Sequence, residues 1–80
     1  MKEEQIKIGI IKVLEENLKL KNLEIKREMQ AYDFEGWDSL AHIGIIISLD
    51  EEFKLRFSIS EISNLKNIGE LIDLIKKKKS

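Results

Sequence analysis

The stretch Gly36-Trp37-Asp38-Ser39-Leu40 stands immediately before a long apolar segment and marks the start of a helix. Asp38 or Ser39 can cap this helix, because either side chain can accept a hydrogen bond from a free amide of the first turn. The spacing of the apolar residues that follow predicts that the helix continues to about Phe53. It is the best-defined element that the sequence predicts.

A helical wheel divides the side chains of this helix into three sets. The face expected to join the core comprises His42, Ile45, Ile46, Leu49 and Phe53. An adjoining apolar arc, the docking strip, comprises Leu40, Ile43 and Ile47. The expected outer face comprises Ala41, Gly44, Ser48, Glu51 and Glu52. The core does not require the docking strip, and such a surplus apolar strip is typical of a helix that binds a partner protein.

The segment before this helix divides into a first helix and a long loop. A helix from about Glu3 to Leu18 is predicted by apolar residues at helical spacing, namely Ile6, Ile10, Val13, Leu14 and Leu18, with Ile8 and Ile11 widening the stripe. The segment from Lys19 to Gly36 has weaker periodicity and is expected to form a long ordered loop. The residues expected to anchor it to the core are Leu20, Leu23, Ile25, Tyr32 and Phe34. A loop of this length in a small domain indicates function.

Two helix starts follow the central helix. Ser58-Ile59-Ser60-Glu61 fits a capping box and opens a short third helix that bears Ile62 and Leu65. Asn67-Ile68-Gly69-Glu70 can open a fourth helix in the same way. The apolar face of that helix comprises Ile68, Leu71, Ile72 and Ile75. The lysines at 76–79 complement the negative end of its dipole.

Composition limits the class of protein. Eighty residues allow one domain, residues 1–80, and we expect it to be monomeric. The chain has no cysteine, which excludes disulfides and thiolate metal sites and suits the cytoplasm. It has no proline and is rich in Leu, Ile, Lys and Glu, which favours an all-α domain. No apolar run is long enough to span a membrane, and residues 1–4 lack the order of a signal peptide.

Charge is distributed unevenly along the chain. The formal net charge is −1, yet residues 33–52 carry acids and no Lys or Arg. These acids are Asp33, Glu35, Asp38, Asp50, Glu51 and Glu52. An acidic region around Ser39 would steer basic partner surfaces toward this serine.

The chain resembles the acyl carrier protein and peptidyl carrier protein family over nearly its whole length. The resemblance rests on Asp38-Ser39-Leu40, the apolar helix ending in Asp50-Glu51-Glu52-Phe53, the pair Phe57-Ser58, the short helix through Ile62 and Leu65, and the helix start Asn67-Ile68. The tripeptide alone is a weak signal, whereas the complete spacing is specific. The resemblance implies a four-helix bundle of the acyl-carrier type, with a long first loop and a short third helix.

The resemblance also implies a role. Ser39 would accept 4′-phosphopantetheine from coenzyme A through a separate phosphopantetheinyl transferase, and the terminal thiol would carry acyl or aminoacyl groups as thioesters. The protein would then be a carrier with no catalytic residue and no metal. Asp38 and Leu40 would help the transferase to recognise the site.

The partners implied are the transferase, an acyl- or aminoacyl-loading ligase, and downstream transferases or synthases of a biosynthetic pathway. Leu40, Ile43 and Ile47 would form the docking surface, with Glu51 and Glu52 at its rim. Family members of bulk fatty-acid synthesis place acids just after the serine, where this chain has Ala41, His42 and Gly44. This departure favours a carrier of a specialised pathway with amino-acyl, D-alanyl, hydroxy-acyl or polyketide-like cargo.

Other interpretations of the same residues remain open at this point. Ser39 can be only a helix cap, and the chain can be an unmodified interaction module that kept the docking strip. Asp38, Ser39 and His42 suggest a small hydrolase, but no nucleophile elbow is present, and a packed, hydrogen-bonded His42 is favoured. Trp37 can pack over the helix start or contact the prosthetic arm or a partner.

Three further features have simple explanations. Gly44 can be merely tolerated, or it can permit close approach of the arm or a partner. Consecutive acids at 50–52 point in different directions along a helix, so a solvated face is expected in place of a metal site. The lysine run 76–79 is expected to be a solvated helix end without contacts to nucleic acid or membrane.

Overall fold

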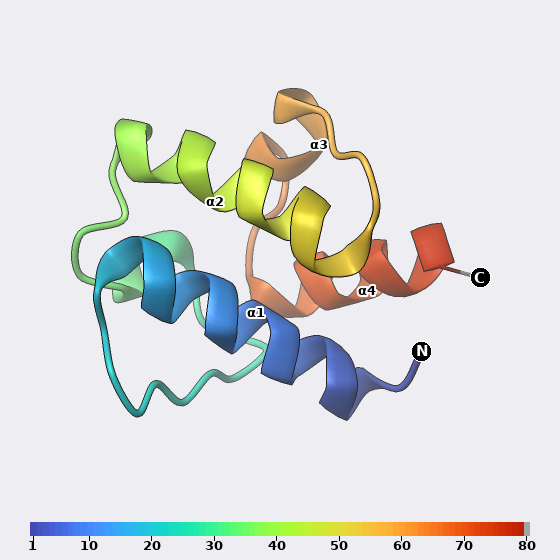
Figure 1. The fold of residues 1–80 in the computed structure, drawn as a ribbon, viewed down its shortest axis with the longest axis horizontal. Helices are drawn as coiled ribbons and strands as arrows, with labels where there is room; N and C mark the ends of the chain where they lie inside the picture. The colour runs from blue at the N-terminus through green and yellow to red at the C-terminus, as the bar shows by residue number, and fades with distance from the viewer. Residues whose placement is uncertain (80) are drawn as a thin grey trace.

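The computed structural model describes residues 1–79, which form α-helices joined by loops and contain no strand. The helices are α1 (Glu3–Leu18), α2 (Ser39–Phe53), α3 (Ile59–Ser63) and α4 (Ile68–Lys79). Figure 1 shows α1 running alongside α2, with α4 behind them and the short α3 beside α2. The bounds predicted for α1 and α2 are confirmed. Ser80, the last residue of the expected domain, lies outside the described residues.

Apolar side chains from all four helices and the loops form one core. The buried members are Ile6, Ile10, Val13, Leu14, Ile25, Phe34, Ile45, Ile46, Leu49, Phe53, Phe57, Ile62, Ile68, Leu71, Ile72 and Ile75. The core faces predicted for α2 and α4 are therefore confirmed, except that His42 is only half-buried. On α1, Ile11 packs against the core, whereas Ile8 is 65% exposed and does not belong to it.

The face of α2 that the wheel assigned to the outside in fact packs partly against α1. A Cβ on Gly44 would lie 2.9 Å from Asn17 Oδ1, and Asn17 Nδ2 donates to Ser48 Oγ at 2.9 Å. Glu52 forms an ion pair with Lys12 at 3.4 Å. The prediction was wrong for Gly44, Ser48 and Glu52, because these small and polar residues allow the two helices to approach closely. Glu51 remains on the outside.

Two of the five predicted loop anchors enter the core. Ile25 and Phe34 are buried, and Leu23 packs at its edge. Tyr32 is 78% exposed, so its assignment as an anchor was wrong. It lies in η1 (Ala31–Asp33), a 3₁₀ turn that periodicity did not predict and that directs this side chain to solvent. Leu20 is only half-buried.

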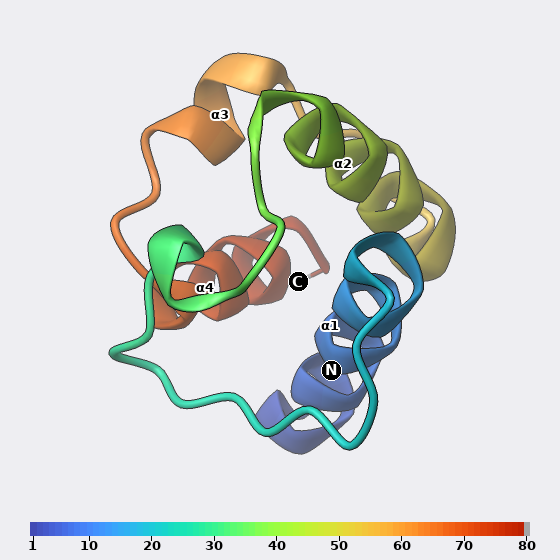
Figure 2. The ribbon, with the colours of Figure 1, turned by 90° about the vertical axis from the view of Figure 1, so that its left-hand side faces the viewer.

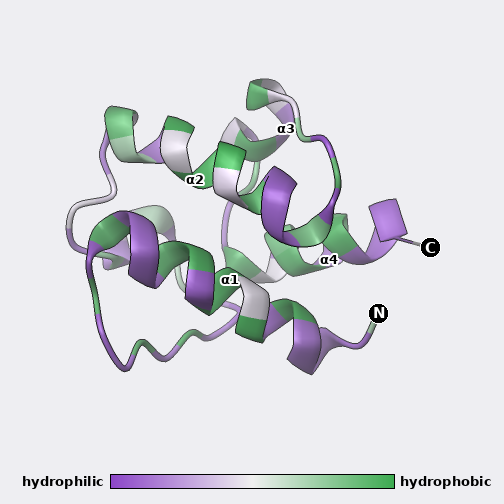
Figure 3. Ribbon diagram, viewed as in Figure 1, coloured by the Kyte–Doolittle hydropathy of each residue, from purple (hydrophilic) through white to green (hydrophobic). Residues whose placement is uncertain are grey.

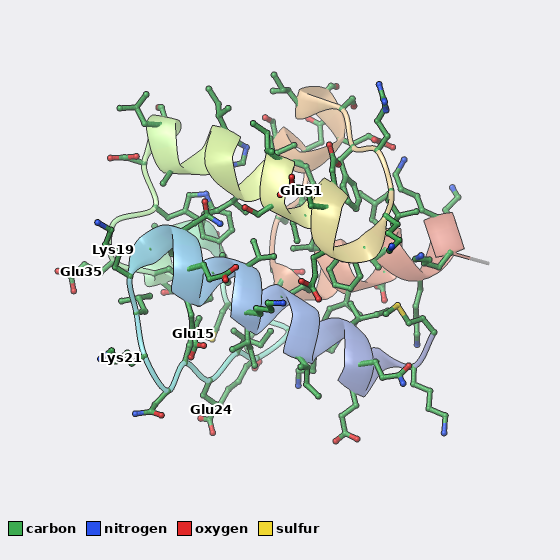
Figure 4. The ribbon with its side chains drawn as sticks, viewed as in Figure 1. Glu15, Lys19, Lys21, Glu24, Glu35 and Glu51 are labelled. Atoms are coloured by element: carbon green, nitrogen blue, oxygen red, sulfur yellow. The ribbon has the colours of Figure 1, made fainter. Side chains whose placement is uncertain are left out.

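The long loop is held by hydrogen bonds near its start and at its middle. Glu15 points from α1 toward the loop (Figure 4), where its Oε2 accepts from the Leu23 amide at 2.9 Å. Further along, the carbonyls of Arg27 and Met29 accept from the Gly69 and Ile68 amides, each at 2.8 Å. Figure 2 shows the loop passing close to the start of α4. These bonds satisfy amides at the start of α4 that have no partner within the helix.

The side chain of Arg27 ties the same loop to two helices. Its guanidinium forms ion pairs with Glu3 of α1 at 3.0 Å and with Asp73 of α4 at 2.9 Å. These two carboxylates raise the pKa of Arg27 above its ordinary value, with Asp73 the larger cause. Because the groups are exposed, the pairs fix the position of the loop more than they add to stability.

The caps predicted for α3 and α4 are largely confirmed. Ser58 Oγ accepts from the Glu61 amide at 3.0 Å, and Glu61 Oε1 accepts from the Ser58 amide at 2.9 Å, which completes the capping box. Asn67 caps α4 by accepting from the Glu70 amide. Glu70 itself, however, accepts from the Lys66 amide and not from Asn67, so the second box differs from the prediction. Leu65, predicted within α3, lies just beyond its end.

The lysine run at the end of α4 is not wholly a solvated end. Lys78 Nζ pairs with Glu61 at 3.0 Å, donates to the Arg56 carbonyl at 3.2 Å and stands 5.5 Å from the ring centroid of Phe57. These contacts connect the end of α4 to the start of α3. No helix among residues 1–79 is long and apolar enough to cross a bilayer.

Candidate functional site

Ser39 lies at the surface at the start of α2, and its side chain does not cap the helix. Gly36 has a φ of +87°, which glycine adopts without strain, and the turn leads directly to Asp38. Asp38 Oδ1 accepts from the Ala41 amide at 2.9 Å, so Asp38 is the cap. Ser39 is the first residue of α2, is exposed, and its hydroxyl makes no hydrogen bond to any of residues 1–79. The interpretation of Ser39 as only a cap is therefore wrong.

Trp37 and His42 form a packed pair beside this serine. Trp37 Nε1 donates to His42 Nδ1 at 3.1 Å, and the Trp37 ring lies 5.7 Å from that of Phe34. Packing of Trp37 over the helix start and the hydrogen-bonded state of His42 are both confirmed. Within residues 1–79 His42 makes no hydrogen bond to Ser39, so nothing activates the serine as the nucleophile of a hydrolase.

The docking strip is exposed as predicted. Leu40, Ile43 and Ile47 are 83%, 51% and 54% exposed. Figure 3 shows hydrophobic residues at the outer turns of α2 near its start. Glu51 continues the same arc one turn later, because residues four apart share a helix face, and Figure 4 shows its position on α2. Ser39 stands at the edge of this arc, beside Ile43. The predicted residues therefore lie on one side of α2.

Ile59 is an exposed apolar residue that the sequence reasoning missed. It is the first residue of α3 and is 63% exposed. The capping box drew attention to Ser58 and Glu61, while the apolar residue between them was assigned no role. The sequence did contain a signal for it. Ile59 is an apolar residue in the first turn of a short capped helix, and it lies outside the predicted apolar face of that helix.

The acidic residues around Ser39 divide into structural and free groups. Asp38 caps α2, and Asp50 Oδ1 accepts from the Phe57 amide at 2.8 Å. Asp33 Oδ2 accepts from the Gln30 amide at 2.8 Å. Glu35 and Glu51 are exposed at the surface (Figure 4). Within the described chain no group of three acids or histidines could hold a metal ion.

A cavity of about 150 Å³, which the sequence did not predict, lies behind the start of α2. Trp37 and His42 form part of its wall, and most of the remaining wall is aliphatic. Its lining also includes the exposed residues Ala31, Ser63 and Lys66, so the cavity reaches the surface.

Comparisons with known proteins agree with this geometry. A family model described as "Phosphopantetheine attachment site" matches residues 9–75. The acyl carrier protein of Buchnera aphidicola subsp. Acyrthosiphon pisum (strain Tuc7) is 34% identical over 76 residues, covering 95% of this chain and 90% of that protein. The acyl carrier protein of Acidothermus cellulolyticus is 25% identical over 75 residues, covering 94% and 89%.

The fold agrees as well. The solution NMR structure of holo acyl carrier protein from Geobacter metallireducens matches with a TM-score of 0.78 and 31% identity. The match covers 96% of this chain and 84% of that chain. The chain belongs to the acyl carrier protein family. The predicted all-α carrier fold is therefore confirmed.

Membership of this family defines the prosthetic group and the type of activity. The acyl carrier protein is a carrier and not a catalyst, and its prosthetic group is 4′-phosphopantetheine. The residues fit this group, because an exposed serine hydroxyl, without a hydrogen-bond partner among the residues that the structure describes, stands at a helix N-terminus. The free amides there favour the negative charge of a phosphodiester.

Proposed function

We propose that Ser39 is the attachment point of 4′-phosphopantetheine. The observation that supports it most is at the start of α2, where Asp38 caps the helix and the exposed Ser39 hydroxyl has no hydrogen-bond partner in the described part of the chain. The other serines differ. Ser58 is a cap and Ser48 accepts from Asn17, so neither hydroxyl is free in the same way.

Attachment requires a base and a metal ion, which a separate transferase would supply. The Ser39 hydroxyl loses its proton and forms a P–O bond to the pantetheine phosphate of coenzyme A. The pyrophosphate P–O bond breaks, and adenosine 3′,5′-bisphosphate leaves. When attached, the group supplies a terminal thiol that holds acyl or aminoacyl cargo. The chain itself has no cysteine that could compete for the cargo.

The docking strip is proposed to bind the partner enzymes. These are the phosphopantetheinyl transferase, an acyl- or aminoacyl-loading ligase, and downstream transferases or synthases. Leu40, Ile43 and Ile47 supply apolar area, and Glu51 supplies charge at the rim. Asp38 contributes chiefly by holding Ser39 in the first turn.

The charge of α2 supports a specialised pathway over bulk fatty-acid synthesis. After Asp38 the next acid is Asp50, so the first turns beyond Ser39 carry no negative charge. Gly44 carries less weight than the sequence suggested, because packing against Asn17 already explains it. The proposal therefore rests on Ala41 and His42, and on the neutral docking strip.

Intact-mass analysis tests the attachment. The protein is incubated with coenzyme A and a broad-specificity transferase, together with Ser39→Ala and the control Ser60→Ala. Ser60 is also exposed near a helix start. Wild type and Ser60→Ala should gain one phosphopantetheine group, and Ser39→Ala should gain none while its circular dichroism stays normal. An unchanged wild-type mass, or an equal gain in Ser39→Ala, would overturn the proposal.

A further inference from the structure

Trp37 and His42 lie on either side of Ser39, at the two positions of a helix staple. Asp38 is the N-cap of α2, so Trp37 is the residue before the cap and His42 is the fourth residue of the helix. Side chains that pack together from these positions fix the angle at which the chain enters a helix. The two rings lie 6.2 Å apart, centroid to centroid. The pair therefore encloses the turn that presents Ser39.

Both members of the pair are anchored to the rest of the fold. The Trp37 ring lies 5.7 Å from the ring of Phe34, a buried member of the core, and the Trp37 amide donates to the Phe34 carbonyl at 3.3 Å. The His42 amide donates to the Asp38 carbonyl at 2.8 Å, where the backbone ladder of α2 begins. A displacement of either ring would therefore move the residues between them, including Ser39.

A hydrogen bond distinguishes this staple from a purely apolar one. Trp37 Nε1 donates to His42 Nδ1 at 3.1 Å. An indole N–H can only donate, so Nδ1 must be the acceptor and carry no proton. A protonated imidazole carries a proton on both nitrogens. Protonation of His42 would thus set two donors against each other, and the bond within the staple would be lost.

The elements around His42 carry charged groups that have other partners or no ion pair with it. Asp38 on α2 and Asp33 in η1 each accept from a backbone amide. Glu61 of α3 is paired with a lysine of α4. Lys66, between α3 and α4, lines the same cavity as His42. Among residues 1–79 none of these groups forms an ion pair with the imidazole. In this arrangement protonation would remove the bond to the indole without gaining an ion pair.

We infer that the Trp37–His42 pair positions Ser39 for attachment of the prosthetic group, and that protonation of His42 releases Ser39 from this position. The inference rests on the proposed attachment at Ser39. Both are positioning residues, because neither exchanges a bond or a proton with the reacting atoms. When the staple opens, the first turn of α2 frays and fewer bound molecules have the hydroxyl aligned for transfer. The kcat of loading should fall, whereas KM should change little because the docking strip is unaltered.

NMR of the unmodified protein tests the staple without any loading step. The chain has one tryptophan and one histidine, so each side chain gives an unambiguous signal. The protein is titrated from about pH 8 to about pH 5, the interval in which histidine usually changes charge. The Trp37 indole N–H signal and the Ser39 amide signal should both move with the midpoint of the His42 ring. Indole and Ser39 signals that stay constant while the ring titrates would overturn the inference.

His42→Asn is the matched variant for loading. Its Oδ1 can accept in place of Nδ1 and does not titrate, and asparagine and histidine have similar helix propensities. The ratio of the kcat of wild type to that of His42→Asn cancels the pH dependence of the transferase itself. We expect a ratio near one at about pH 8. At about pH 5.5 wild type should be about fivefold slower than the variant, as the loss of one hydrogen bond implies.

Trp37→Phe removes the donor and keeps an aromatic ring against Phe34. At about pH 8 its kcat should lie about fivefold below that of wild type, with little change in KM. Its ratio to His42→Asn should stay constant as pH falls, because the staple is already open. The NMR titration of wild type decides the matter if this variant folds poorly. A KM that rises while kcat stays normal would show that the pair acts in docking, which contradicts the inference.

The same assays distinguish failure of the staple from failure of the attachment. If wild type is loaded but its ratio to His42→Asn is the same at every pH, the attachment at Ser39 stands and the role of the pair is wrong. If wild type gains no group at any pH, the attachment itself is wrong, and the role of the pair falls with it.

Discussion

Two sides of α2 contrast in a way that hydropathy alone misrepresents. The docking strip is apolar and exposed, whereas the row formed by Gly44, Ser48 and Glu52 is small or polar and faces α1. Close helix packing explains the second row, because a small residue and a short hydroxyl allow Asn17 to approach. The core does not explain the docking strip. Exposure that packing leaves unexplained is therefore a better sign of partner binding than apolarity.

The largest effect on stability is expected from a larger side chain at Gly44, in the row of α2 that faces α1. Gly44→Leu should destabilise the fold by about 1–3 kcal/mol, because the new side chain would overlap Asn17 and push α1 away. On an outer face the same change would stabilise the helix by about 1 kcal/mol, since glycine is a poor helix former. Chemical denaturation measures whether the free energy of unfolding falls or rises. A gain in stability would show that Gly44 does not lie in the interface.

A moderate effect, on binding only, is expected from a charge in the docking strip. Ile47→Asp should change stability by less than about 0.5 kcal/mol, because the side chain is half exposed. The KM of the transferase for this protein should rise about tenfold, as expected when an apolar contact at an interface is lost. Ile8→Asp is the matched control, since Ile8 is 65% exposed on α1. A collapsed thermal melt would instead place Ile47 in the core.

The smallest effect is expected at Glu61 of α3. Unlike the residues of the docking strip, this charged side chain has partners within the chain. The Ser58 amide, and secondarily Lys78, lower the pKa of Glu61 below its ordinary 4.5. A lowered carboxyl pKa contributes stability above that ordinary value, and the contribution is lost as pH falls through the lowered pKa. Glu61→Gln should therefore melt slightly below wild type at neutral pH.

The pH dependence supplies the control for this last prediction. The difference between wild type and Glu61→Gln should shrink as pH falls below 4.5, the ordinary pKa of the carboxyl. Lys78→Met should narrow the difference at neutral pH, since it removes the paired ammonium. A difference that is the same at every pH would show that the charge of Glu61 has no role.

The sequence predicted what depends on neighbours along the chain. The bounds of α1 and α2, the capping box at Ser58 and the buried face of α4 all follow from local spacing and local hydrogen bonds. The exposed docking strip followed from the same periodicity, as a surplus over what the core needs. The resemblance to a family added the position of the serine.

Features that depend on residues distant in the chain were not predictable in the same way. The contact of Asn17 with Gly44 and Ser48 joins two helices, and no periodicity within α2 encodes it. Tyr32 was assigned to the core because it is aromatic, yet η1 turns it outward. A packed Trp37 and a hydrogen-bonded His42 were predicted, but their pairing with each other depends on the turn at Gly36, and the cavity depends on the position of α3.

The start of α1 and the last turn of α4 lie together, at the opposite end of the molecule from the start of α2. Figure 1 shows these two helix ends on one side and the first turn of α2 on the other, and Lys76 Nζ lies 3.9 Å from Glu3 Oε1. A purification tag, a fluorescent domain or an immobilising linker fused at either terminus would therefore extend away from Ser39. The carrier can be anchored to a surface by its tail while its working end stays open to enzymes in solution.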